Sequence, residues 1–294
     1  MSKKLIDWLI FSVLALIWGS SFILMKIGLD NRISPYDIAA IRMVSAGLVL
    51  LPIAVQSFKK IPINKIPLVF LSGVLGSLLP AFLFCYAEQG MDSSLAGTLN
   101  SLTPIFVIVT GALFFQRTTA ANKVIGILIA FVGCILLLLS KGHIQESNGM
   151  LYPSLIILAT IMYGFNVNLV SKYLSHLPSL QIASVALTLN ALPALAVLLF
   201  TGFFALPFEQ TGFLKGTAAA MVLGIGGTAI ATILFYMLVK RAGGIFASMV
   251  TYGIPFVAIG WGIYFKEEFG WAHVGCLLVI LAGVYWANKK TVAK

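Results

Sequence analysis

Charged side chains are scarce in this sequence. Asp, Glu, Lys and Arg together make up 10% of the 294 residues, whereas an ordinary globular domain carries about 25%. So few charges cannot cover the surface of a water-soluble protein of this length. The shortage excludes a soluble enzyme, a nucleic-acid-binding protein and a disordered chain.

Residues that commonly form metal sites or disulfides are also few. The three cysteines, Cys85, Cys134 and Cys276, all lie inside apolar runs, where we expect packing residues rather than a disulfide framework. The three histidines do not have the spacing of a metal site. We therefore expect no metal, no cofactor and no nucleic-acid partner.

Apolar residues dominate instead: they make up 60% of the chain, and the mean hydropathy is +1.03. A bilayer-spanning helix needs about 20 predominantly apolar residues. We therefore expect an all-α membrane protein with ten transmembrane helices, the first retained rather than removed as a signal peptide. The expected spans are 6–28, 35–55, 67–90, 93–115, 121–140, 149–173, 179–201, 213–239, 243–265 and 269–288.

The basic residues predict the orientation of these spans. With the N-terminus inside, 13 Lys and Arg residues lie on the cytoplasmic side and four on the outer side. Cytoplasmic loops of membrane proteins collect Lys and Arg. We therefore expect a multi-pass protein of the inner (cytoplasmic) membrane with both termini in the cytoplasm. The Lys and Arg residues of the cytoplasmic loops also explain the net charge of +10 without nucleic-acid binding.

An internal repeat predicts the architecture. The segment from Ala96 to Pro104 aligns with the segment from Ala247 to Pro255, and Trp18-Gly19 aligns with Tyr163-Gly164. The chain is thus expected to contain two five-span units, residues 1–141 and 142–294. Because five is odd, the second unit enters the membrane from the opposite side, which is typical of secondary transporters with a central binding site.

The run Trp18-Gly19-Ser20-Ser21-Phe22 and the two proline-containing segments resemble the two repeats of the EamA family, within the drug/metabolite transporter (DMT) superfamily. The resemblance covers roughly residues 7–288. It implies a ten-helix bundle around a central cavity that moves small metabolites, often amino acids and often outward. It does not identify the substrate.

Polar and aromatic residues deep in the spans, several of them matched between the repeats, are the candidates for the transport path. Pro104 and Pro255 lie near mid-membrane and predict kinks that line the path, with packing kinks as the alternative. The candidate substrate-binding residues are Trp18, Ser21, Arg42, Tyr86, Asn100, Thr103, Tyr163, Asn166, Tyr236, Thr251 and Tyr252.

Structural roles compete with binding for each candidate. The polar residues around Asn100 and Thr251 can hold helices together, Trp18 and Tyr163 can pack in a core, and Tyr86 and Tyr236 can anchor at the membrane interface or act as gates. Asn168 and Asn190, which have no match across the repeat, are expected to tie helices together.

Three charged residues within the spans need an explanation of their own: Lys26, Arg42 and Glu88. Lys26 is close enough to the surface for its side chain to snorkel. Arg42 lies two turns inside its span and can pair with Asp37 or Asp30, or hold a substrate carboxylate by bidentate hydrogen bonds. Glu88 lies near an outer end, and the lack of a carboxylate at the midplane favours facilitated diffusion over proton coupling.

These features predict a secondary transporter, not an enzyme. We expect it to export amino acids or similar zwitterionic or anionic small molecules by alternating access, from within the lipid bilayer, as a monomer or a dimer. An uptake permease is the first alternative. A membrane-embedded enzyme would need converging His, Asp or Glu residues, and a receptor or assembly subunit would not need polar residues matched across the repeats.

Overall fold

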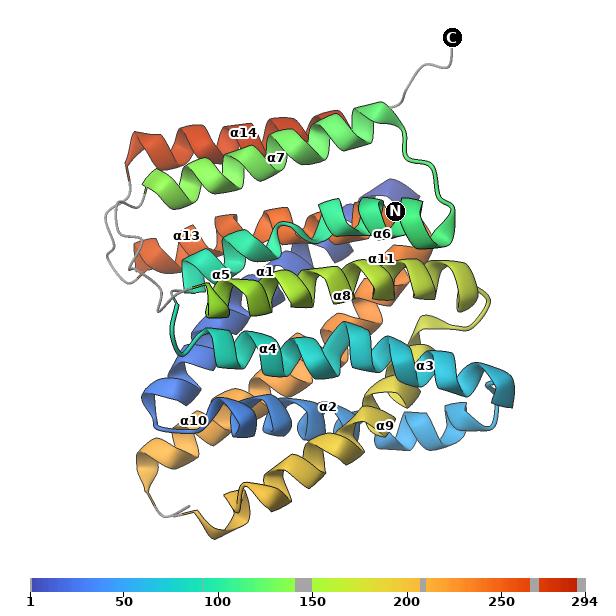
Figure 1. The fold of residues 1–294 in the computed structure, drawn as a ribbon, viewed down its shortest axis with the longest axis vertical. Coiled ribbons are helices and arrows are strands. Elements are labelled where there is room, and N and C mark those ends of the chain that lie inside the picture. The colour runs from blue at the N-terminus through green and yellow to red at the C-terminus, as the bar shows by residue number, and fades with distance from the viewer. Residues whose placement is uncertain (1, 92, 141–149, 207–209, 265–269, 290–294) are drawn as a thin grey trace.

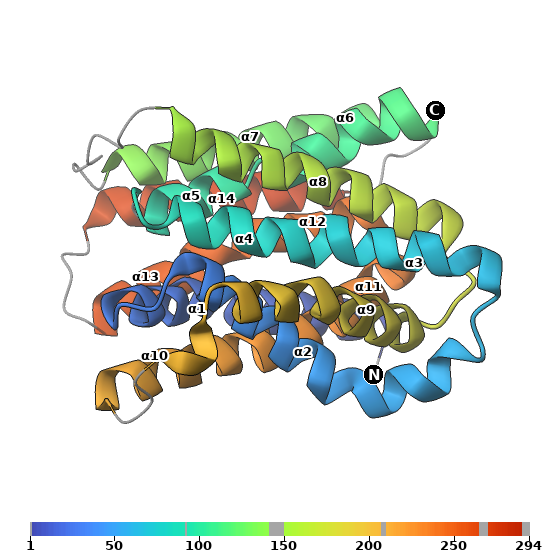
Figure 2. The ribbon, with the colours of Figure 1, turned by 60° about the horizontal axis from the view of Figure 1, so that its bottom comes forward.

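The computed structural model describes residues 2–91, 93–140, 150–206, 210–264 and 270–289. Most of its helices run roughly along one direction in both views (Figures 1 and 2). The helices α7 and α14 lie side by side at one edge of the bundle, and α9 and α10 lie at the other (Figure 1). The expected boundary between the halves, at residues 141 and 142, lies outside the described residues.

The ten expected spans are all represented by helices. Several spans consist of two or three consecutive helical pieces. The first five spans contain α1 (Lys3–Asp30), α2 (Pro35–Phe58), η1 (Ile63–Lys65), α3 (Ile66–Gly73), η2 (Val74–Leu78), α4 (Leu79–Ala87), α5 (Ser93–Asn100), α6 (Thr103–Phe115) and α7 (Ala121–Ser140). The second five contain α8 (Leu151–Tyr173), α9 (Ser179–Phe200), α10 (Thr211–Val222), η4 (Leu223–Ile230), α11 (Ala231–Ala242), α12 (Gly244–Ser248), η5 (Met249–Gly253), α13 (Ile254–Tyr264) and α14 (Trp271–Asn288), with a short helix η3 (Phe203–Ala205) after α9.

Length and hydropathy support a multi-pass membrane protein. Nine helices or helix runs among the described residues are long and apolar enough to cross a bilayer, and α7 contains a shorter apolar segment, Ala121–Leu137. Several boundaries differ from expectation by a few residues. The third span ends at Ala87 rather than at residue 90, so Glu88 follows the span.

Local signals explain several helix ends. Ser34 caps α2 by accepting a hydrogen bond from the Asp37 backbone N–H (3.1 Å), and Pro35 occupies the first helical turn. Between α11 and α12, Gly243 adopts a φ of +90°. A side chain would strain this conformation, so the glycine allows the chain to turn there.

The third span of each half contains a π-helical stretch. These stretches, η2 and η4, include Gly76 and Gly227 respectively. A Cβ at Gly76 would overlap the Asn166 amide on α8, and a Cβ at Gly227 would lie 2.9 Å from Ser21 Oγ on α1. The glycines therefore let the first span of each half approach the third span of the other half closely.

Corresponding helices of the two halves pair in opposite directions. In the α7–α14 pair, Gly126 faces Ala287 while Gly133 faces Ile280. In the α2–α9 pair, Asp37 contacts Thr201 while Gly47 contacts Thr188. Both pairs are antiparallel, as two inverted five-span repeats require.

One end of the bundle gathers basic residues, the start of α1 and the end of α14. Arg241 Nε lies 2.6 Å from Asp7 Oδ1 near the start of α1, and Asn122 Nδ2 donates to the Lys289 carbonyl after α14 (2.8 Å). Lys172 Nζ donates to the Phe115 carbonyl. We call this end the basic end; α1 starts and α14 finishes there (right side of Figure 1).

Candidate functional site

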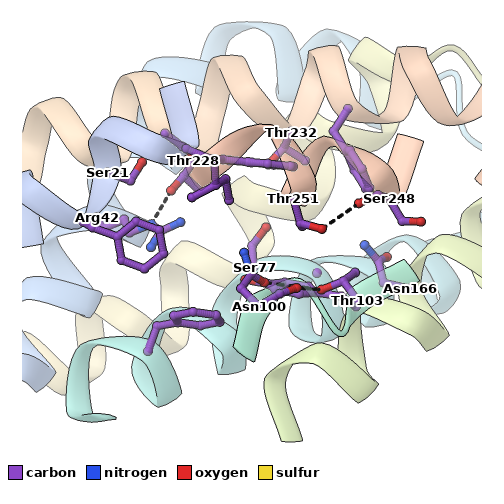
Figure 3. Close-up of a pocket in the computed structure, with 18 of the residues that line it drawn as sticks. Ser21, Arg42, Ser77, Asn100, Thr103, Asn166, Thr228, Thr232, Ser248 and Thr251 are labelled. Carbon is purple, nitrogen blue, oxygen red and sulfur yellow. Dashed lines mark hydrogen bonds between the residues drawn. The ribbon is translucent and has the colours of Figure 1, made fainter. Parts of the chain in front are cut away.

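A cavity of about 90 Å³ lies between the two halves. Helices from both halves form its wall, and its polar side chains project from two facing sides (Figure 3). The lining residues are Trp18, Ser21, Phe22, Met25, Arg42, Gly76, Ser77, Phe84, Asn100, Thr103, Tyr163, Asn166, Gly227, Thr228, Thr232, Phe235, Tyr236, Ser248, Thr251 and Ile254.

Arg42 is the one charged residue among the described residues that line this cavity. Its Nε–H donates to Thr228 Oγ1 at 2.6 Å (Figure 3). A guanidinium has five N–H donors, and within the described residues this is the one hydrogen bond that the Arg42 side chain makes. Pairing with Asp37 does not occur, because the Asp37 carboxylate accepts from Ser34 (2.8 Å) and Thr201 (2.6 Å) instead.

Aromatic rings form much of the apolar wall. Trp18 Nε1 donates to the Gly227 carbonyl at 3.1 Å, within the π-helical stretch η4, and its ring packs against Phe235 with centroids 5.3 Å apart. Tyr163 stacks on Phe84 with centroids 6.2 Å apart. The cavity thus combines one cation, several hydroxyl and amide groups, and aromatic faces that can contact an organic solute.

Each fourth span is interrupted beside the cavity. Pro104 and Pro255 are the second residues of α6 and α13, so each follows a break in its span. Proline lacks the N–H that a continuous helix would need. Thr103 Oγ1 donates to the Asn100 carbonyl (2.7 Å) before the first proline, and Thr251 Oγ1 donates to the Ser248 carbonyl (3.1 Å) before the second.

Nine of the eleven candidate binding residues line the cavity. They are Trp18, Ser21, Arg42, Asn100, Thr103, Tyr163, Asn166, Tyr236 and Thr251. Tyr86 packs instead against Tyr36 and Tyr152, with centroids 5.7 and 6.0 Å apart. Tyr252 donates its hydroxyl to the Ile127 carbonyl (2.9 Å) and so holds η5 against α7. The structure does not bring these two residues to the cavity.

Sequence reasoning missed several small polar residues in the wall, including Ser77 and Thr228. A signal was present in the repeat: Ala96 and Ala247 are 151 positions apart (247 − 96), and so are Ser77 and Thr228 (228 − 77). Extending the alignment upstream at this constant offset would have paired them. Apart from this offset, an isolated hydroxyl within an apolar run does not indicate that a residue lines a cavity.

A second cavity, of about 450 Å³, lies at the basic end. Its wall includes Arg117, Lys123 and Asn168. The Asn168 amide ties α6 to α8 as expected, because it donates to the Val107 carbonyl (2.9 Å), to Thr110 Oγ1 (3.0 Å) and to the Gly164 carbonyl (3.0 Å). No acidic residue is among the described residues that line this cavity.

Two inverted helical halves around a central cavity define a membrane carrier of the inverted-repeat class. The chain belongs to the EamA-like transporter family, whose sequence pattern matches residues 6–139 and 150–289. The expected family, fold and non-enzymatic character are therefore confirmed.

Two relatives and one solved structure illustrate the similarity. The inner membrane transporter YedA of Escherichia coli is 27% identical over 95% of this chain and 92% of its own. A probable amino-acid metabolite efflux pump of the same organism is 26% identical over 86% of this chain and 77% of its own. A solved crystal structure shares the fold, with a TM-score of 0.72 at 18% identity over 96% of each chain.

Proposed function

We propose that this transporter exports amino acids or similar zwitterionic or anionic metabolites across the cytoplasmic membrane by alternating access. Residues 1–141 and 142–294 act as the two halves, and both termini lie in the cytoplasm. The similarity to an amino-acid metabolite efflux pump and to an inner membrane transporter supports this proposal.

The observation that carries the proposal is the chemistry of the central cavity. The Arg42 guanidinium is the sole charge in its described wall, and its two terminal nitrogens are left without a hydrogen-bond partner from the described residues. Arginine binds carboxylates in a bidentate manner. The hydroxyl groups of Ser77 and Thr251 and the ring of Trp18 offer contacts for the rest of an amino acid.

The cavity at the basic end supports the outward direction. Arg117 and Lys123 give its wall a positive charge, which raises the local concentration of anionic solutes. In the proposed orientation this cavity faces the cytoplasm. It then collects carboxylate-bearing metabolites close to the central cavity, since α8 contributes Asn168 to its wall and Asn166 to the wall of the central cavity.

Efflux from proteoliposomes tests the proposal. Vesicles containing the purified protein are loaded with a uniformly ¹³C-labelled mixture of the twenty protein amino acids, and the labelled compounds released are identified by mass spectrometry. A limited set should leave faster than from protein-free vesicles, and Arg42→Gln should slow that set. Release of no amino acid above the protein-free rate would overturn the proposal.

Lys26→Gln is the matched control for charge. Lys26 lies on α1 at the same end of the bundle as Arg42, but it is exposed and does not line the cavity. Both variants remove one positive charge from the same end of the bundle, and only Arg42→Gln removes a group from the cavity wall. Efflux that falls in the Arg42 variant and not in the Lys26 variant identifies a contact in the cavity.

A further inference from the structure

Glu88 lies one helical turn beyond the cavity wall. The Glu88 backbone N–H donates to the Phe84 carbonyl (3.0 Å), which continues the helical hydrogen bonding past the end of α4. Residues four apart share a face of a helix, and Phe84 lines the cavity. Glu88 therefore occupies the cavity-facing side of α4, on the end opposite to the basic end.

The Glu88 carboxylate is buried and has few hydrogen-bond partners. The residue is 9% exposed. Oε2 accepts one hydrogen bond, from Ser93 Oγ on α5 (3.3 Å), and Oε1 has no hydrogen-bond partner among the described residues. Burying a charged carboxylate without partners is costly, so such a group holds its proton more tightly than it would in water.

Two cations act on this carboxylate. Arg42 from α2 and Lys26 from α1 favour its charged form, and among the described residues the other titratable group that interacts with it is Cys85 on its own helix. Burial outweighs the Ser93 hydrogen bond and both cations and raises the pKa of Glu88 to about 8. The group consequently titrates within the physiological range.

A substrate carboxylate at Arg42 changes this balance. The bound anion neutralises the guanidinium charge, which weakens its attraction for the Glu88 carboxylate and raises the proton affinity of Glu88. The effect is reciprocal, since coupling between two binding sites acts equally on both. Protonation of Glu88 therefore strengthens anion binding at Arg42.

We propose that Glu88 is the proton-binding residue of this carrier, and that it takes up a proton when a carboxylate substrate binds at Arg42. This inference rests on the proposed function. The proton joins a Glu88 oxygen from water on the side where the substrate enters, and it returns to water on the side of release. No other bond forms or breaks. The lack of a midplane carboxylate, which favoured uncoupled transport, does not prevent this coupling.

The test uses the same proteoliposomes, the labelled amino-acid mixture and a pH-sensitive dye trapped in the lumen. Glu88→Gln imitates the protonated side chain at every pH. With a pKa of about 8, the ratio of wild-type to Glu88→Gln efflux should fall about tenfold between pH 7 and pH 9, because the protonated fraction falls by that factor. Ionisation of the amino acids themselves cancels in this ratio.

Proton movement provides the second measurement. At pH 8 the wild type should remove more protons from the lumen per labelled molecule than Glu88→Gln does. Asp30→Asn is the matched control, because Asp30 is an exposed carboxylate at the same end of the bundle; it should behave as the wild type. If Glu88→Gln does not fold, the infrared carboxylic-acid band of the wild type should weaken from pH 7 to pH 9 and recover on addition of a transported amino acid.

The results that would contradict the inference can be told apart from the result that would also contradict the proposed function. A constant ratio between pH 7 and pH 9, or equal proton movement in the wild type and Glu88→Gln, would overturn the inference and leave the proposed function intact. A ratio that rises with pH would show that Glu88 binds the substrate ammonium group in its charged form, which also overturns it. Absence of amino-acid efflux from the wild type would overturn the proposed function and the inference together.

Discussion

Replacing Arg42 by glutamine should weaken substrate binding without removing the cavity. Because Nε is engaged with Thr228, the terminal nitrogens are the donors that reach a substrate carboxylate. A hydrogen bond to a charged group contributes about 1.5–3 kcal/mol, and each 1.4 kcal/mol is a tenfold change in affinity. Loss of this contact should therefore raise the apparent KM for amino-acid efflux about 10- to 150-fold.

Lysine at the same position separates charge from geometry. Arg42→Lys keeps the positive charge but cannot form the planar bidentate contact and loses the Nε–H that holds Thr228. Its KM should lie between those of the wild type and Arg42→Gln. The measurement is the concentration dependence of efflux for the amino acid released fastest from the labelled mixture, with Lys26→Gln as the charge control.

The reasoning about Arg42 fails if Arg42→Gln retains a KM within about threefold of the wild type. It also fails if Lys26→Gln raises the KM as much as Arg42→Gln does, because a long-range electrostatic effect would then explain both results. Equal melting temperatures of the variants in detergent confirm that the comparison concerns binding and not folding.

Three further predictions concern stability and gating. Gly283→Ala should destabilise the protein by about 1–3 kcal/mol, because its Cβ would lie 2.6 Å from the Gly126 carbonyl oxygen; Gly275→Ala, with open space on the same helix, should not lower the melting temperature. Asn168→Leu removes three hydrogen bonds between and within α6 and α8 and should increase maleimide labelling of a cysteine introduced at Ser77 from the basic end. Unchanged labelling would show that these hydrogen bonds do not help to close that end. Because the pKa of Glu88 is raised to about 8 from 4.5, its protonated form stabilises the fold at low pH, and this contribution is lost as the pH rises through about 8. The melting temperature of the wild type should fall between about pH 4.5 and pH 8 relative to that of Glu88→Gln, and parallel curves would refute the assignment.

The spans and the family could be predicted from sequence because each rests on a local pattern. Apolar runs give the helices, and the recurrence of Ala96 to Pro104 at Ala247 to Pro255 gives the repeat. The same recurrence selects Asn100 and Thr251, which face one cavity although they lie in different halves.

What could not be predicted depends on contacts between distant helices. The engagement of Arg42 by Thr228 joins residues 186 positions apart, and the constant repeat offset alone does not bring them together. Tyr86 and Tyr252 were equal in type to Tyr163 and Tyr236, yet the rotation of their helices turns them toward Tyr36 and Ile127. Likewise, the burial of Glu88 follows from the packing of α5 against it rather than from its position in the chain.

Alternate exposure of the central cavity to the two sides of the membrane is the central claim, and thiol labelling at Ser77 tests it most directly. Ser77 lines the cavity from η2 (Figure 3), and replacing the buried Cys85, Cys134 and Cys276 by alanine leaves Ser77→Cys as the sole thiol. A membrane-impermeant maleimide applied to intact cells and to inside-out vesicles should label this cysteine from both sides. Labelling from one side alone, or from neither, would contradict the account.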